Sequence, residues 1–236
     1  MRAIGAAWLL ATAAAALNPS QIAHAEDTAA PSAGERGFGF TASFFQMEFF
    51  GENQVTPGAP AVGAPGISEL HYQDAFGRGQ GLEAGVYYSF NRFVRVGGSL
   101  IQETAPGRHA AGGEFPNGIT FGDFHLQGLT VGAQGRYPLG RFAPYVLLEV
   151  GEARISALGA DTGGGSFPYW DSTSVPFMEI GIGSDLRIAP KVALTFGARV
   201  QDTGDTGHPT PAAGLVSSAT GTAATMFCIG VAIDLH

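Results

Sequence analysis

Eight segments of this chain alternate apolar and polar side chains with a period of two, and this pattern constrains the fold more than any other feature. In segment 81–90, for example, Leu82 and Val86 share one face, while Glu83 and Ser89 share the other. A period of two is that of a β-strand, whose successive side chains point to opposite faces. The sequence therefore predicts an all-β fold. The predicted strands comprise residues 37–49, 81–90, 93–103, 122–137, 142–156, 173–188, 191–202 and 225–235.

Short and long connections between these segments alternate along the chain. The three short ones are residues 91–92, 138–141 and 189–190, which suit tight hairpins. The four long ones, rich in Gly, Pro, Ala and Ser, are residues 51–80, 104–120, 157–172 and 203–224. Each segment reaches the roughly 9 to 11 residues that a tilted strand needs to cross a bilayer. Hydrocarbon cannot satisfy an open sheet edge, so we expect a closed antiparallel eight-stranded up-and-down transmembrane β-barrel.

The first 25 residues have the pattern of a secretory signal peptide. Arg2 precedes an apolar run over 3–17, and the small-residue sequence Ala23-His24-Ala25 resembles a cleavage site. Residues 26–36 are small, polar and aperiodic, and we interpret them as a periplasmic lead-in. The sequence thus predicts export of a barrel domain spanning residues 37–236 to the outer membrane of a Gram-negative cell.

The composition indicates which face of the barrel meets lipid. Only 14% of the residues are charged and Lys191 is the sole lysine, which is sparse for an exterior in water. We therefore expect the apolar rows to face outward. The net charge of −8 argues against nucleic acid as a partner. The single cysteine, Cys228, excludes an internal disulfide.

Scattered charges on the polar rows are predicted to lie in the lumen. Eight strands enclose a space that side chains can fill, so these charges should pair across the interior and leave no general diffusion pore. We assign them a structural role rather than a substrate site. The predicted lumen network is Glu83, Arg95, Arg136, Glu149, Glu179, Asp185, Arg187, Arg199 and Asp234.

Aromatic residues in the first and third long loops are the candidates for contact with an external partner, because loops on a rigid scaffold often carry function. An alternative interpretation is a belt of aromatic rings at the outer membrane interface. The recognition candidates are Tyr72, Phe76, Phe167, Tyr169 and Trp170.

No catalytic, cofactor or metal site is predicted. Lipid A deacylases carry a His-x-Ser pair, but the nearest sequence here is His125-Leu126-Gln127, which has Gln at the position of the nucleophile. We interpret His125 as a polar residue of the outer rim. The remaining histidines of the exported chain, His71, His109, His208 and His236, lack a second ligand at metal spacing. Asp161, Asp202 and Asp205 are explained by turn chemistry better than by calcium binding.

Two stretches resemble a known family. GAQGRYPLGRFAPYVLLEVGEARI at 132–155 and MEIGIGSDLRIAPKVALTFGARV at 178–200 are similar to hairpins of the small outer-membrane β-barrels that include the OmpA membrane domain and OmpX-type barrels. The resemblance implies outer-membrane lipid and lipopolysaccharide as surroundings and the barrel-assembly machinery as a partner. Family members usually end on Phe or Trp, whereas this sequence ends in residues 234–236, Asp-Leu-His.

The function expected from these features is a structural or surface-recognition role through the long external loops, without enzymatic activity. Two alternatives stay open at this point. One is a lipid A-modifying outer-membrane enzyme, an acyl hydrolase or transferase. The other is a soluble periplasmic barrel that binds an apolar ligand as a lipocalin does, because alternation alone does not say which face is wet.

Overall fold

The computed structural model describes residues 36–51, 54–56, 70–112, 115–207 and 219–235. The chain divides into a unit of residues Met1–Gly34 and a unit of residues Glu35–His236, and every described residue belongs to the second. The predicted signal peptide and all of the predicted lead-in except Arg36 lie outside the described residues. No helix in the described part of the chain is long and apolar enough to cross a membrane.

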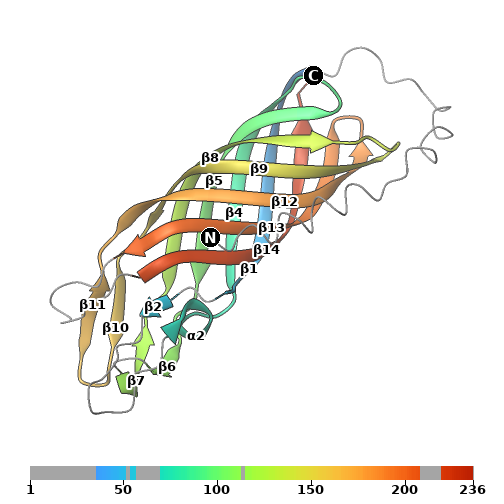
Figure 1. The fold of residues 1–236 in the computed structure, drawn as a ribbon. Coiled ribbons are helices and arrows are strands. Elements are labelled where there is room, and N and C mark those ends of the chain that lie inside the picture. Colours follow the sequence, from blue (N-terminus) through green and yellow to red (C-terminus); the bar gives the residue numbers. More distant parts are fainter. Residues whose placement is uncertain (1–35, 52–53, 57–69, 113–114, 208–218, 236) are drawn as a thin grey trace. The chain divides into compact units, whose positions relative to one another are not determined.

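Eight long strands form one closed antiparallel barrel (Figure 1). They follow the order β1-β14-β13-β12-β9-β8-β5-β4, and the ring closes because the first strand pairs with β14 on one side and with β4 on the other. The predicted all-β, eight-stranded up-and-down barrel is therefore confirmed. The strands are β1 (Gly37–Phe49), β4 (Gly79–Ser89), β5 (Val94–Ala105), β8 (Phe124–Arg136), β9 (Phe142–Ile155), β12 (Thr173–Ala189), β13 (Val192–Gly207) and β14 (Ala219–Asp234).

Three tight connections join β4 to β5, β8 to β9 and β12 to β13 at one end of the barrel, which we call the turn end. In the first, the side-chain oxygen of Asn91 accepts hydrogen bonds from the backbone N–H groups of Phe93 (2.7 Å) and Val94 (2.9 Å). In the second, Gly140 has a φ of 63°, which glycine adopts at low cost. Local turn chemistry thus accounts for these hairpins.

The opposite end, the loop end, carries further secondary structure where the sequence predicted only loops. Four short strands form a sheet in the order β11-β10-β7-β6, and β2 pairs with β3 beside a single-turn helix. The sheet joins the second and third long connections, so its pairing depends on residues distant in sequence. The elements are β2 (Gln54–Thr56), β3 (Leu70–His71), α2 (Tyr72–Ala75), β6 (His109–Gly112), β7 (Phe115–Phe121), β10 (Leu158–Asp161) and β11 (Ser166–Trp170).

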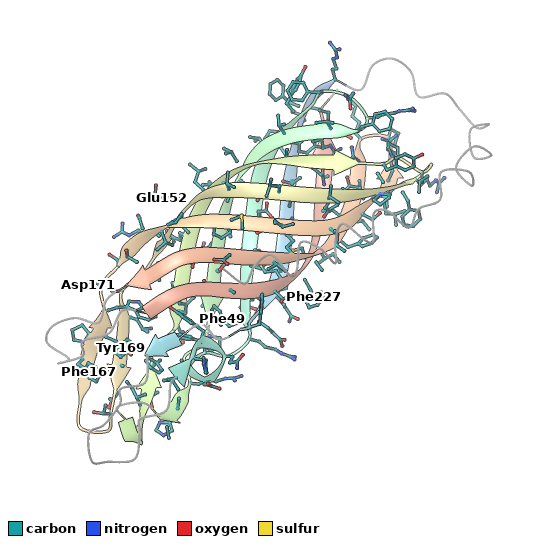
Figure 2. The ribbon with its side chains drawn as sticks, viewed as in Figure 1. Phe49, Glu152, Phe167, Tyr169, Asp171 and Phe227 are labelled. Atoms are coloured by element: carbon teal, nitrogen blue, oxygen red, sulfur yellow. The ribbon has the colours of Figure 1, made fainter. Side chains whose placement is uncertain are left out.

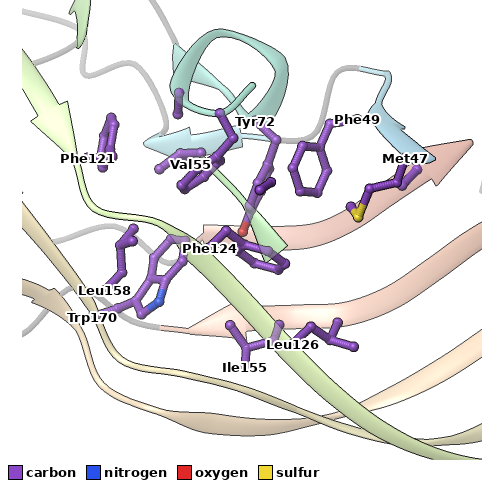
Figure 3. Close-up of a cluster of buried hydrophobic side chains, with 14 of the residues drawn as sticks. Met47, Phe49, Val55, Tyr72, Phe121, Phe124, Leu126, Ile155, Leu158 and Trp170 are labelled. Atoms are coloured by element: carbon purple, nitrogen blue, oxygen red, sulfur yellow. The ribbon is translucent and has the colours of Figure 1, made fainter. Parts of the chain in front are cut away.

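Buried apolar residues gather toward the loop end, in a cluster that we call the loop-end core (Figure 3). It combines inward side chains from the parts of the barrel strands nearest the loop end with side chains from the added elements. The interior nearer the turn end, by contrast, is polar. The largest fully buried apolar side chains of this core are Trp170, Tyr72, Tyr169, Phe45, Phe76, Phe124, Met47, Ile119, Leu126, Ile155 and Met226.

Candidate functional site

The exterior of the barrel is an apolar band. Val131 is 61% exposed, Phe227 65% and Ile229 62%, and Figure 2 shows Phe227 pointing away from the barrel. Water-soluble proteins rarely expose a continuous apolar surface of this kind, whereas hydrocarbon accepts it without cost. The apolar rows therefore face outward and the polar rows inward.

Polar side chains end this band on the side of the loop end. Gln46 on β1 pairs in register with Gln80 on β4, and Gln102 on β5 pairs with Gln127 on β8; all four side chains are exposed. On β1 and immediately before β4 the next outward residues toward the loop end are charged, and these two side chains, Glu48 and Arg78, form an ion pair. The glutamines thus mark the level at which the exterior changes from apolar to polar.

Inside the barrel, near the turn end, two arginines and two aspartates form a charge-balanced cluster. Arg95 donates to Asp185 and to Asp234, each at 3.1 Å, and Arg136 donates to Asp185 at 2.8 Å. The hydroxyl of Tyr87 donates to Asp234 at 2.7 Å, and the Arg95 guanidinium lies 4.2 Å from the centre of the Tyr87 ring. The cluster joins β4, β5, β8, β12 and β14 across the lumen.

A second cluster lies farther toward the loop end and is centred on Arg199. One nitrogen of its guanidinium, Nη1, lies 2.6 Å from Glu83 and 2.7 Å from Glu179. Ser43 donates a further hydrogen bond of 3.0 Å to Glu83. All four side chains are buried, so these charges depend on one another for solvation.

Hydroxyl groups rather than cations solvate the next carboxylate, Glu149. Thr130 donates to it at 3.1 Å and Ser99 at 3.4 Å. Between the two charge clusters lies a cavity of about 80 Å³, lined in part by Tyr145, Glu149 and Arg199. A polar space of this size has room for several water molecules.

Glu103 is buried on the loop-end side of the Arg199 cluster, close to the loop-end core. Gln201 donates a hydrogen bond of 3.2 Å to it, and both side chains are almost completely inaccessible. Sequence reasoning missed this carboxylate, although the strand period places it on the same face as Ser99 and Ile101. Ser43 and Tyr87 were missed for a different reason, because only charged residues were considered.

The structure thus places eight of the nine predicted lumen residues inside the barrel, in the contacts given above. Arg187 is the exception and corrects the prediction. Its side chain is exposed at the turn end, where the pairing of β12 with β13 shifts register between Arg187 and Ala189. The pairing is regular up to Arg187, which lies opposite the buried Ala193, so the alternation is not reversed there. Arg187 is exposed because it lies two residues beyond Asp185, at the end of the barrel.

The aromatic rings of the loop-end core contact one another over the mouth of the barrel (Figure 3). The ring centre of Phe124 lies 5.4 Å from that of Phe49 and 5.6 Å from that of Phe76, and the ring of Tyr72 lies 6.3 Å from that of Trp170. Such pairs contribute about 0.5–1.5 kcal/mol each beyond the area they bury. The rings therefore form a packed apolar plug.

This packing corrects the assignment of the loop aromatics as a contact surface or an interface belt. Tyr72, Phe76, Tyr169 and Trp170 are at most 2% exposed, and only Phe167 is partly accessible. The Trp170 indole donates to the carbonyl of Ser156 at 3.2 Å, and the Tyr169 hydroxyl to the carbonyl of Val55 at 3.5 Å. Their polar atoms are thereby satisfied within the protein.

Inward apolar residues of the barrel strands complete this plug and were not among the predicted site residues. In β1 the inward row changes from Thr41 and Ser43 to Phe45, Met47 and Phe49 toward the loop end. The sequence shows the same change after Phe44, where the apolar residues of the alternation move to positions 45, 47 and 49 and the polar ones to 46 and 48. The change marks where a polar lumen gives way to an apolar one.

The histidine, aspartate and cysteine side chains considered as chemical candidates lie at separate places in the described structure. His125 is exposed on the outer face, with Nδ1 3.1 Å from the hydroxyl of Thr104. Asp161 accepts a hydrogen bond of 2.6 Å from the backbone N–H of Gly163, as in an Asx turn. Cys228 is buried with a free thiol. Within the described ranges, no group of three or more His, Cys, Asp or Glu side chains is placed to hold a metal ion.

Two solved structures with this architecture are similar to the chain. Neisserial surface protein A matches with a TM-score of 0.54 and 13% sequence identity, over 84% of this chain and 97% of that protein. The outer membrane protein OprG from Pseudomonas aeruginosa matches with a TM-score of 0.51 and 12% identity, over 86% of this chain and 98% of that protein. No protein-family model and no curated protein matches the sequence. The chain therefore has the fold of the small outer-membrane β-barrels, as its sequence resemblance implied.

Proposed function

We propose that this chain is an integral outer-membrane β-barrel with a sealed lumen and no enzymatic activity. Its role is to strengthen the envelope and to present a rigid surface at the loop end for recognition. The observation that supports the proposal is an apolar exterior around an interior that holds paired charges toward the turn end and the loop-end core toward the loop end.

The apolar exterior supports insertion in lipid rather than a soluble ligand-binding barrel. A lipocalin-like binder needs an apolar interior to hold its ligand, but the middle of this lumen holds Arg199 with Glu83 and Glu179. Its outer wall would also need polar side chains, where this barrel presents Leu, Val, Ile and Phe. Lipid and lipopolysaccharide are thus the proposed surroundings, and the barrel-assembly machinery the proposed insertion partner.

The sheet β11-β10-β7-β6 is the proposed recognition platform. The inward side chains of this sheet are part of the loop-end core, so its exposed side chains are held in fixed positions. Asp171 immediately follows β11 and is exposed, while the nearby rings of Tyr169 and Trp170 are buried (Figure 2). We infer that recognition uses the exposed polar side chains of this end rather than the aromatic rings.

Membrane extraction and conductance measurements test the proposal together. The full chain should remain in outer membranes after a carbonate wash and should migrate differently on a gel before and after boiling. Reconstituted in a planar bilayer, it should give no steady conductance, because no continuous water path crosses the paired charges and the apolar plug. Release by carbonate contradicts the membrane assignment, and a stable open level contradicts the sealed lumen.

Lipid A analysis tests the absence of enzymatic activity. Purified barrel incubated with lipopolysaccharide should leave the acyl chains of lipid A unchanged by mass spectrometry. Loss or transfer of an acyl chain that His125→Ala abolishes would identify an enzyme and overturn this part of the proposal.

A further inference from the structure

Exposed charges are distributed unequally between the two ends of the barrel. Besides Arg187, four cationic side chains of the described part of the chain are exposed at the turn end and form a group that we call the basic rim. They lie before β1 and in each of the three turns. The basic rim consists of Arg36, Arg92, Arg141 and Lys191.

Among the described residues, no exposed carboxylate accompanies these cations. The two aspartates nearest to the turn end, Asp185 and Asp234, point inward and bind Arg95 and Arg136. The described part of the loop end has the opposite character, with three exposed arginines against six exposed carboxylates. Those carboxylates are Glu48, Asp74, Asp123, Glu152, Asp171 and Asp202.

Aromatic side chains place the basic rim at the height of lipid headgroups. Phe90 and Phe142 are exposed at the turn end of the apolar band, and the Arg92 guanidinium lies 4.6 Å from the centre of the Phe93 ring. Aromatic side chains prefer the boundary between hydrocarbon and headgroups. Cations attached just beyond them therefore reach the phosphate layer.

We propose that the basic rim binds the headgroups of anionic phospholipids in the leaflet at the turn end. This inference rests on the proposed membrane insertion, and it adds the class of lipid that the barrel recruits. Guanidinium groups form paired hydrogen bonds to phosphate oxygens, and cations near an anionic surface gain from its potential. Because the cations are spread over the N-terminal strand and all three turns, the rim surrounds the barrel and holds several lipids.

Lipid retention in a mixed bilayer tests this inference. The full chain is reconstituted with equal amounts of phosphatidylglycerol and phosphatidylcholine of the same acyl chains, then extracted gently, and the bound lipids are counted by native mass spectrometry. The test variant is R92Q/R141Q/K191Q. The matched control, R78Q/R108Q/R154Q, removes the same number of charges from the loop end.

The wild-type barrel and the loop-end control should retain phosphatidylglycerol at least five-fold over phosphatidylcholine, and the rim variant should retain both equally. Raising the salt concentration should reduce the enrichment of the wild type, which provides a readout even if the rim variant folds poorly. A wild-type barrel that inserts but shows no enrichment overturns the lipid inference alone, as does a folded rim variant that keeps the enrichment. A chain that does not insert overturns the proposed function itself.

Discussion

Arg199 on β13 and Glu83 on β4 meet across the interior of the barrel, with Arg199 Nη1 2.6 Å from the Glu83 carboxylate. Two strands, β1 and β14, separate β4 from β13 around the ring, so this contact spans the lumen rather than a strand pair. The same nitrogen also binds Glu179, which makes one cation the partner of two buried carboxylates. The stability of the barrel should therefore depend strongly on this one side chain.

Replacing Arg199 with Met should lower the free energy of unfolding by about 3–5 kcal/mol, because it leaves Glu83 and Glu179 buried without their cation. Urea titration of the barrel in lipid vesicles measures the change. The triple variant R199M/E83Q/E179Q should recover part of the loss, since it removes the uncompensated charges as well. Unchanged midpoints in both variants would contradict the inward placement of this cluster.

Replacing Trp170 with Ala should open a cavity in the loop-end core at a cost of about 3–5 kcal/mol. The sheet β11-β10-β7-β6 should then become accessible to protease, because its anchor to the barrel is weakened. Limited proteolysis of the reconstituted protein checks this, with cleavage sites located by mass spectrometry. Phe142→Ala is the control, since that ring is exposed at the turn end and should leave the loop end resistant.

Replacing Gly183 with Val should destabilise the barrel by about 1–3 kcal/mol through overpacking. A Cβ atom at Gly183 would collide with the ring of Tyr145, whose hydroxyl lies 3.2 Å from that of Thr195. At Gly135, which is exposed, the nearest atom to such a Cβ is a methyl group of Val146 at 3.4 Å. Gly135→Val should therefore unfold at nearly the wild-type urea concentration, and equal losses in both variants would refute the steric argument.

An arginine in place of Val131 should cost about 2 kcal/mol or more when the barrel folds into vesicles, because the charge enters the apolar band. Gln127→Arg, four residues away on the same face of β8, adds the same charge at the level of the glutamines and should cost far less. The two variants are compared by their urea midpoints in one lipid. If Gln127→Arg were the more costly, the band would have been assigned to the wrong height.

The strands could be predicted from the sequence because the signal is local. Strands β4 and β5 begin or end within about two residues of their predicted limits, and alternation also gave the correct direction of Glu83, Arg95 and Glu179. Alternation did not indicate where the lumen ends. Arg187 keeps the register of the inward row, opposite Ala193, but it lies beyond Asp185 at the turn end, where its side chain is exposed.

The amino-acid order by itself determined which eight segments form the barrel, the tight turns and the division into apolar and polar rows, because each depends on neighbours a few positions apart. It did not determine every strand limit, since β13 and β14 extend five and six residues into the predicted loop 203–224. Only the tertiary structure decided which charges meet and which aromatic rings are buried. Arg199 and Glu83 are 116 positions apart, and Tyr72 reaches Trp170 only when two long connections fold over the same mouth. Such contacts depend on the closure and stagger of the whole barrel, and no local period encodes them.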